Sequence, residues 1–209
     1  MREPSGRLAS GDVARLEQPC GRGVRVPNGY FGVKALKKSL FAAAALLAST
    51  AAPASAGEIF GGVFAHDVKT GITRSGIEDG VDFQLGYRGE RFRGSTNKWV
   101  PAPYVFVSVN SVGDTNFAAA GLSWKFGERV YFRPGIGLAI HDGPSQVVPG
   151  DDRIDFGSRI LFEPEAAIGV QINERLSAEA SIVHLSHAQL FGRQNPGIDN
   201  IGVRVNYRF

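Results

Sequence analysis

Cysteine and methionine are almost absent from this sequence. Cys20 and Met1 are the only examples in 209 residues, and both lie in an N-terminal segment that we expect the mature protein to lose. The remaining chain then has no cysteine, which excludes disulfides, thiol catalysis and thiolate metal sites. Histidine and carboxylate chemistry remain, and we predict neither a metal nor a cofactor.

The N-terminal segment has the features of an export signal. Three lysines, Lys34, Lys37 and Lys38, precede the apolar run Leu40–Leu47, and the small residues Ala54-Ser55-Ala56 follow. A basic region, a short apolar region and a small-residue cleavage site define a secretory signal peptide. The apolar run is too short to span a bilayer, which takes about 20 residues. We therefore expect residues 33–56 to be a signal peptide cleaved after Ala56.

Residues 1–32 are unusual upstream of such a signal, because they are charged and rich in glycine. We interpret them as an upstream extension from a misassigned start, with Val33 as the true initiator read from an alternative start codon. Peptides of the precursor that map before Val33 would contradict this interpretation. The mature domain is then predicted to be residues 57–209.

The charge balance changes sign when residues 1–56 are removed. These residues hold eight of the 23 Lys and Arg and three of the 20 Asp and Glu, which leaves 15 basic and 17 acidic residues in the mature chain. Nucleic-acid binding needs a basic patch, so we expect no nucleic-acid partner.

Long apolar runs are also missing after residue 57, so no membrane-spanning helix is expected. Apolar residues instead recur at every second position. In Val81–Arg88, four apolar side chains alternate with Asp82, Gln84, Gly86 and Arg88, as in a strand with one apolar and one polar face. About eight such strands are predicted, at Ile59–Asp67, Val81–Arg88, Tyr104–Asn110, Asn116–Phe126, Val130–Ile140, Phe162–Gln171, Leu176–Ser186 and Ile201–Phe209.

The connections between these strands favour a membrane barrel. Short turns at 127–129 and 173–175 contrast with long loops at 141–157 and 187–198, which is typical of bacterial outer-membrane barrels. The terminal Phe209 resembles the C-terminal aromatic signal that the barrel assembly machinery reads. We therefore predict an all-β fold, an eight-stranded antiparallel transmembrane β-barrel. The alternative, a soluble sandwich or lipocalin-like barrel, would place charges outside and needs no aromatic terminus.

An eight-stranded barrel has room inside only for side chains. We expect its polar residues to form a packed network rather than a pore, and those on the polar faces are Asp82, Arg88, Arg133, Glu163, Glu165, Arg204 and Arg208. A site built from Glu163 and Glu165 is the alternative.

Three polar residues share the apolar face near the end of the chain. His184 and Ser186 are two residues apart, roughly 6.6 Å on a strand. Asp199 has the parity of the lipid-facing residues of the last strand. With both termini in the periplasm, loop 187–198 is extracellular and the three groups can converge at the outer rim. Ionisable groups on a lipid face are costly, so their convergence calls for a reason.

That reason can be nucleophilic catalysis. A serine hydroxyl needs a base to take its proton, and the base works best when a carboxylate fixes its tautomer. Ser186, His184 and Asp199 fit these roles in that order. Asn195, or backbone amides near His187, could stabilise the oxyanion. The alternative is an ordinary polar rim where strand meets loop.

The segment His184-Leu-Ser186-His-Ala, followed by Asn195-Pro-Gly-Ile-Asp199 and a terminal strand, resembles the PagL-type lipid A 3-O-deacylases. Their pattern is His-x-Ser-Asn, then Asn-x-Gly-Ile-Glu, then a last strand. The acid here is aspartate, the connection is one residue longer, and His187 replaces the usual asparagine. The resemblance implies an eight-stranded barrel without a cofactor, with His184, Ser186 and Asp199 as the catalytic residues.

The resulting prediction is a serine esterase of the Gram-negative outer membrane that hydrolyses the 3-O-linked acyl chain of lipid A from the outer leaflet. Its expected partners are lipopolysaccharide, outer-membrane lipid and the assembly machinery, and a homodimer is left open. A non-catalytic barrel with a structural or adhesion role is the main alternative. A lipocalin-type carrier is a third, which extraction without detergent would support.

Overall fold

The computed structural model describes residues 57–71, 73, 76–146, 149–151, 153–188 and 196–209. The expectations for residues 1–32 and 33–56 lie outside this range. Nine strand segments and one short 3-10 turn, η1 (Phe92–Gly94), make up its regular structure. The strands are β1 (Glu58–Ala65), β2 (Val81–Arg88), β3 (Ala102–Asn110), β4 (Phe117–Ser123), β5 (Phe126–Gly127), β6 (Val130–His141), β7 (Ile160–Gln171), β8 (Leu176–Leu185) and β9 (Ile198–Arg208).

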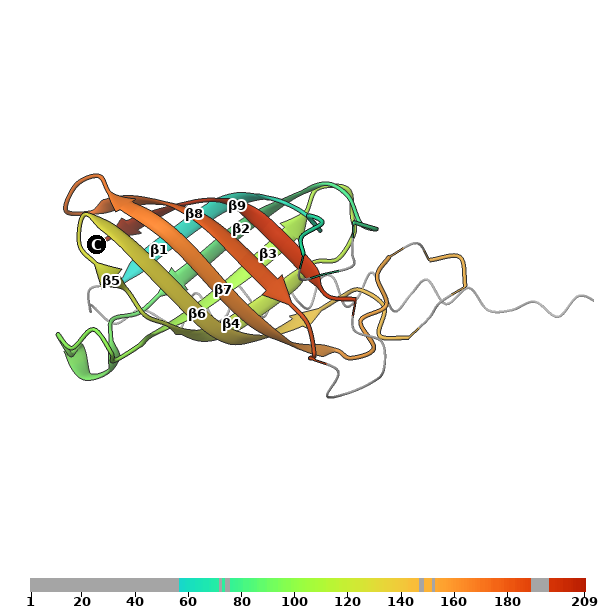
Figure 1. Cartoon of the computed structure of the whole chain (residues 1–209), viewed down its shortest axis with the longest axis horizontal. Coiled ribbons are helices and arrows are strands. Elements are labelled where there is room, and N and C mark those ends of the chain that lie inside the picture. The colour runs from blue at the N-terminus through green and yellow to red at the C-terminus, as the bar shows by residue number, and fades with distance from the viewer. Residues whose placement is uncertain (1–56, 72, 74–75, 147–148, 152, 189–195) are drawn as a thin grey trace, which may run out of the picture.

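The strands close into an antiparallel barrel (Figure 1). The sheet runs in the order β4-β3-β2-β1-β9-β8-β7-β6-β5, and β4 also pairs with β6, which joins the two edges. β4 and β5 are one spanning strand interrupted at Trp124 and Lys125. Opposite this interruption is Pro134, which accepts a hydrogen bond from the Trp124 amide but has no N–H to return. The predicted eight-stranded barrel is confirmed. No helix among the described residues is long and apolar enough to cross a membrane.

The alternation in sequence becomes an apolar outside and a polar inside. Phe83, Leu85, Leu138, Ile168 and Val203 each expose about half or more of their surface. This arrangement suits a barrel surrounded by lipid, because the hydrocarbon solvates apolar side chains and the closed ladder pairs the backbone groups.

The interior is filled by ion pairs and aromatic rings. Arg204 Nη1 lies 2.6 Å from Glu165 Oε2, and its guanidinium stacks within 5.0 Å of the Phe60 ring centroid. Arg133 Nε lies 2.9 Å from Glu179 Oε1. Among the predicted interior charges the structure buries Asp82, Arg88, Arg133, Glu163, Glu165 and Arg204.

The prediction that Arg208 joins this network is wrong. Arg208 is the last residue of β9 and is exposed at the end of the barrel, where its amide donates to the Arg175 carbonyl. Strand parity assigned it to the interior, but the barrel wall ends there and the side chain reaches the mouth.

The two mouths of the barrel differ. The terminal mouth holds Gly57, Arg208, the turns at 128–129 and 172–175, and the longer connection 89–101. The loop mouth holds the connections 66–80, 111–116, 142–159 and 186–197. Ile154 and Phe156, from one of these loops, are almost completely buried in the same core cluster as Leu185 and Ile198. Side chains from this loop thus pack into the barrel core.

Candidate active site

Strands β8 and β9 bring together the residues that the sequence singles out. His184 and Asp199 are direct partners in the antiparallel ladder between these strands. Ser186 follows β8 and forms an isolated bridge with Phe162 of β7, with hydrogen bonds of 3.1 Å from the Ser186 amide and 2.7 Å to its carbonyl. Backbone pairing on both sides therefore fixes the positions from which these side chains project.

The three side chains form a continuous hydrogen-bonded chain. His184 Nδ1 lies 2.6 Å from Asp199 Oδ1, and His184 Nε2 lies 2.9 Å from Ser186 Oγ. When Nδ1 carries its hydrogen toward the carboxylate, Nε2 presents a lone pair to the serine hydroxyl. This is the tautomer in which an imidazole removes a proton from a nucleophile.

The connection 66–80 covers the carboxylate end of this chain. Two hydroxyls, of Thr70 and Thr73, donate to Asp199 Oδ2; the Thr73 bond is 3.1 Å long. The Val68 amide donates to the Asp199 carbonyl at 2.7 Å. The Asp199 side chain has no exposed surface, whereas 18% of the His184 side chain is exposed. The three side chains therefore lie on the outer face of the strands, as expected, but the connection 66–80 separates the acid from the lipid.

This cover could not be predicted from the sequence alone. Thr70 and Thr73 are 129 and 126 residues from Asp199, and no local pattern links them. Only the pairing of β1 with β9 brings the connection 66–80 across the start of β9. The two threonines after the first strand can be linked to Asp199 only when this strand pairing is known.

Two residues at the start of this connection hold its shape. Asp67, in a left-handed conformation with φ of 47°, accepts amide hydrogen bonds from Gly76, Ile77 and Glu78 through one carboxylate oxygen. These three bonds tie the two ends of the connection together.

His66 lies next to Asp67 and adds an ionic contact. Its Nε2 is 2.8 Å from Glu78 Oε2 and its Nδ1 is 2.9 Å from Asp82 Oδ1. Burial alone would lower the pKa of His66, but the hydrogen bonds and negative charges of Asp82 and Glu78 raise it to about 9. His66 is therefore a cation at neutral pH, held between two carboxylates.

Gly197 is required where the last strand begins. Its φ of 64° is left-handed, and a Cβ there would lie 3.0 Å from the Leu185 carbonyl oxygen, 3.2 Å from Thr73 Cγ2 and 3.3 Å from His184 Cε1. A side chain would be strained in conformation and would press on the imidazole. Glycine thus lets the chain pass close behind His184.

The two oxyanion candidates are placed unequally. His187 is completely buried beside Ser186, and Asn195 lies outside the described residues. The Ser186 amide already donates to Phe162 in the strand bridge. Ala188, with φ of 51°, turns the chain directly after this segment. Among the described residues, no group of three or more His, Cys, Asp or Glu side chains has the arrangement of a metal site.

A closed, lipid-compatible barrel with a serine, a histidine and a carboxylate hydrogen-bonded at its rim defines an outer-membrane protein with the layout of a hydrolase. The family model described as lipid A 3-O-deacylase (PagL) matches residues 79–208. The chain belongs to this family, a family of outer-membrane lipid A deacylases. The predicted family resemblance is confirmed.

One solved structure supports the same fold. The crystal structure of the outer membrane enzyme PagL is 16% identical, with a TM-score of 0.52 over 72% of this chain and 98% of that chain. The outer membrane protein Ail of Yersinia pestis, solved in a phospholipid bilayer nanodisc, is 13% identical, with a TM-score of 0.41 over 73% of this chain and 99% of that one. No curated protein sequence matches significantly.

Proposed function

We propose that this protein is a serine esterase that removes the acyl chain ester-linked at the 3 position of lipid A. The observation that carries the proposal is the hydrogen-bonded chain from Ser186 through His184 to Asp199. Membership of the family supports lipid A as the substrate. The hydrogen-bonded side chains support a mechanism that works without a cofactor.

In the proposed first step, Ser186 Oγ attacks the ester carbonyl while His184 Nε2 takes the serine proton. The tetrahedral intermediate collapses when His184 returns this proton to the leaving sugar oxygen. The products are the free hydroxyl on lipid A and an acyl-serine. Water, activated by the same imidazole, then releases the fatty acid and restores Ser186. Asp199 stabilises the imidazolium in both halves of the cycle.

The position of the site suits a substrate that stays in the membrane. His184 and Asp199 project from the outer face of the barrel, the face on which Val203 and Ile201 continue the apolar surface along β9. An acyl chain lying along this surface would bring its ester to the rim where Ser186 lies. We propose that the loop mouth lies outside the cell, so that the reaction takes place in the outer leaflet.

The oxyanion donors are proposed to come from the residues that follow Ser186. The Ser186 amide donates to the Phe162 carbonyl, so we propose His187, which follows it, and Asn195 as the sources of these donors. Losing one such donor typically lowers kcat by about 10²–10³.

The decisive experiment compares lipid A from outer membranes that contain wild-type protein, Ser186→Ala or Ser95→Ala at equal amounts of folded barrel. Ser95 is a serine at the opposite mouth and serves as the matched control. Wild type and Ser95→Ala should remove one hydroxyacyl mass, tandem mass spectrometry should locate the loss at position 3, and Ser186→Ala should leave lipid A intact. Normal deacylation by Ser186→Ala would rule out the serine mechanism, and a loss at another position would rule out the 3-O assignment.

A further inference from the structure

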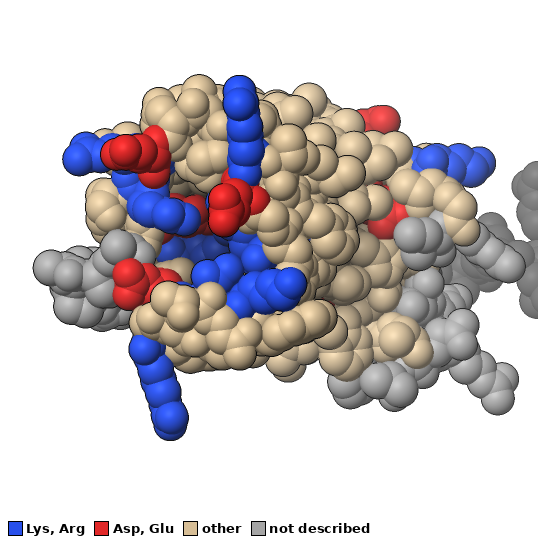
Figure 2. Space-filling view, turned by 60° about the vertical axis from the view of Figure 1, so that its left-hand side comes forward, with Lys and Arg blue, Asp and Glu red and all other residues tan. Residues whose placement is uncertain are grey.

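The proposed function does not use a cavity at the terminal mouth of the barrel. This cavity, of about 1110 Å³, opens at the terminal mouth, whereas Ser186 lies at the loop mouth. Its walls include Gly57, Glu58 at the start of the first strand, and residues of the connection 89–101. Figure 2 shows the recess from outside, with blue basic side chains gathered in it.

Positive charge predominates in the lining. Seven basic residues line the cavity, against four acidic ones. The basic residues are Arg88, Arg91, Lys98, Lys125, Arg129, Arg133 and Arg208, and the acidic ones are Glu58, Glu90, Glu128 and Glu174. A concave site lined with charges of one sign concentrates its electric field and attracts ions of the opposite sign.

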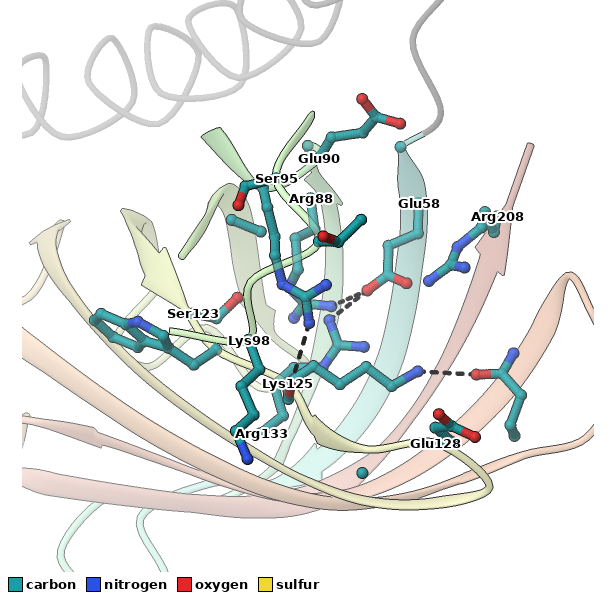
Figure 3. Close-up of a pocket in the computed structure, with 18 of the residues that line it drawn as sticks. Glu58, Arg88, Glu90, Ser95, Lys98, Ser123, Lys125, Glu128, Arg133 and Arg208 are labelled. Carbon is teal, nitrogen blue, oxygen red and sulfur yellow. Dashed lines mark hydrogen bonds and ion pairs between the residues drawn. The ribbon is translucent and has the colours of Figure 1, made fainter. Parts of the chain in front are cut away.

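Two buried arginines share the Glu58 carboxylate at the inner end of the cavity, and Arg133 also pairs with Glu179. Arg88 and Arg133 both bond Glu58 Oε1 through Nη1 (Figure 3). Arg133 Nη2 and Arg88 Nε have no hydrogen-bond partner among the described residues, although both side chains are at least 96% buried. A buried guanidinium with unused donors is costly, and a bound anion or water would satisfy it.

The outer part of the cavity holds further unpaired cations. Within the described chain, no ion pair engages Arg91, Lys98, Arg129 or Arg208. Within the part of the chain that the structure describes, Lys125 Nζ donates to a neutral acceptor, Gln171 Oε1, at 2.9 Å and lies 3.9 Å from the centroid of the Tyr131 ring. The glutamates around the opening therefore form no ion pair with these cations among the described residues.

We propose that this cavity binds an anion that carries several phosphate groups. Arginine forks match phosphate oxygens in pairs, and the lysines add mobile donors. The cationic residues are distributed from the buried pair to the rim, so an extended polyanion can contact both. This activity is separate from ester hydrolysis at the other mouth.

The test measures binding of tripolyphosphate to the protein purified from outer membranes into a zwitterionic detergent, by isothermal titration calorimetry at low salt. Arg91→Gln and Lys125→Gln should each weaken binding about tenfold, the size expected for one charge-assisted hydrogen bond. Arg93→Gln is the matched control, because Arg93 lies on the same connection but outside the cavity lining. It should change the affinity less than twofold, and each variant should show the same unfolding midpoint as wild type.

Equal loss of binding in Arg93→Gln would mean general surface attraction and would overturn the site, as would the absence of binding to wild type. Phosphates of lipid headgroups are a second source of the same chemistry. Adding phosphatidylglycerol to the micelles separates the two. If phosphatidylglycerol competes with tripolyphosphate and the Arg91→Gln and Lys125→Gln substitutions abolish this competition, the cavity binds lipid phosphate. If tripolyphosphate binds without such competition, the cavity binds a free anion.

Discussion

His184 and Asp199 face each other directly across the β8–β9 ladder, with 2.6 Å between Nδ1 and Oδ1. The two strands thus set the distance between the imidazole and its acid, and the cover from the connection 66–80 sets the direction of the carboxylate. Because Oδ1 serves His184 and Oδ2 serves the two threonines, both oxygens are occupied.

Replacing this acid tests how closely the site is fitted to aspartate. Asp199→Asn should lower kcat by about 10⁴, the effect of the wrong imidazole tautomer in a serine triad. Asp199→Glu should also lose activity, because the longer side chain has no exposed space and must displace Thr70 or His184. Turnover of purified lipid A in detergent measures both. Wild-type activity in Asp199→Glu would show that the fit to the shorter acid is not required.

The threonines are expected to act through Asp199 as positioning residues. Thr70→Val and Thr73→Val should each lower kcat about tenfold and the double variant further, because each removes one hydrogen bond to a charged group. KM should stay unchanged, since neither hydroxyl contacts substrate in the proposed mechanism. Thr70→Ser and Thr73→Ser should restore kcat.

Lys69→Gln, an exposed change on the same connection, is the control for these threonine variants. It should behave as wild type. If valine at both positions leaves kcat unchanged, the threonines serve only to pack the connection against the barrel.

How far the sequence predicts this structure depends on the range of each interaction. Alternation is a local signal, so Val81–Arg88 is predicted to the residue. The last strand starts three residues earlier than expected, at Ile198, because the ladder with Leu185 extends into the loop. Strand ends depend on pairing partners, which alternation does not specify.

The residues of the site also divide into those placed by local spacing and those placed by strand pairing. His184 and Ser186 are close because two residues on one strand share a face, which the sequence alone shows. Asp199 requires the register of a neighbouring strand, and Thr70 and Thr73 require a strand pair that closes the barrel. Arg208 is the opposite case. Its parity along the strand is that of the interior residues, but its side chain is exposed because the barrel wall ends there.

The barrel interior makes a separate prediction about stability. Arg204 holds Glu165 at 2.6 Å and donates to Gln84 at 2.9 Å. Arg204→Leu leaves a buried carboxylate without this partner and should lower the free energy of unfolding by about 3–5 kcal/mol. The double variant Arg204→Leu/Glu165→Leu should recover much of the loss. Urea unfolding in micelles measures these effects, with the lipid-facing Val205→Leu as control. A double variant no more stable than Arg204→Leu alone would show that the pair is not the source of the effect.

His66 predicts a loss of order in the connection 66–80 at alkaline pH. Its pKa is raised from 6.5 to about 9, chiefly by the hydrogen bonds to Asp82 and Glu78 that outweigh its burial. A raised pKa means that the folded state binds the proton more tightly than the unfolded state. The stabilisation is therefore complete below about pH 6.5 and is lost as the pH rises through about 9.

The same connection carries Thr70 and Thr73, so deprotonation of His66 should lower activity as well as stability. Wild type should lose free energy of unfolding and lipid A turnover between pH 7 and pH 10. In His66→Gln both quantities should already be lower at pH 7 and should change less over this range. Lysine and tyrosine side chains ordinarily titrate near pH 10, and the comparison of the two proteins removes their shared contribution. Parallel pH profiles for wild type and His66→Gln would show that the ion pairs of His66 do not hold the cover over Asp199.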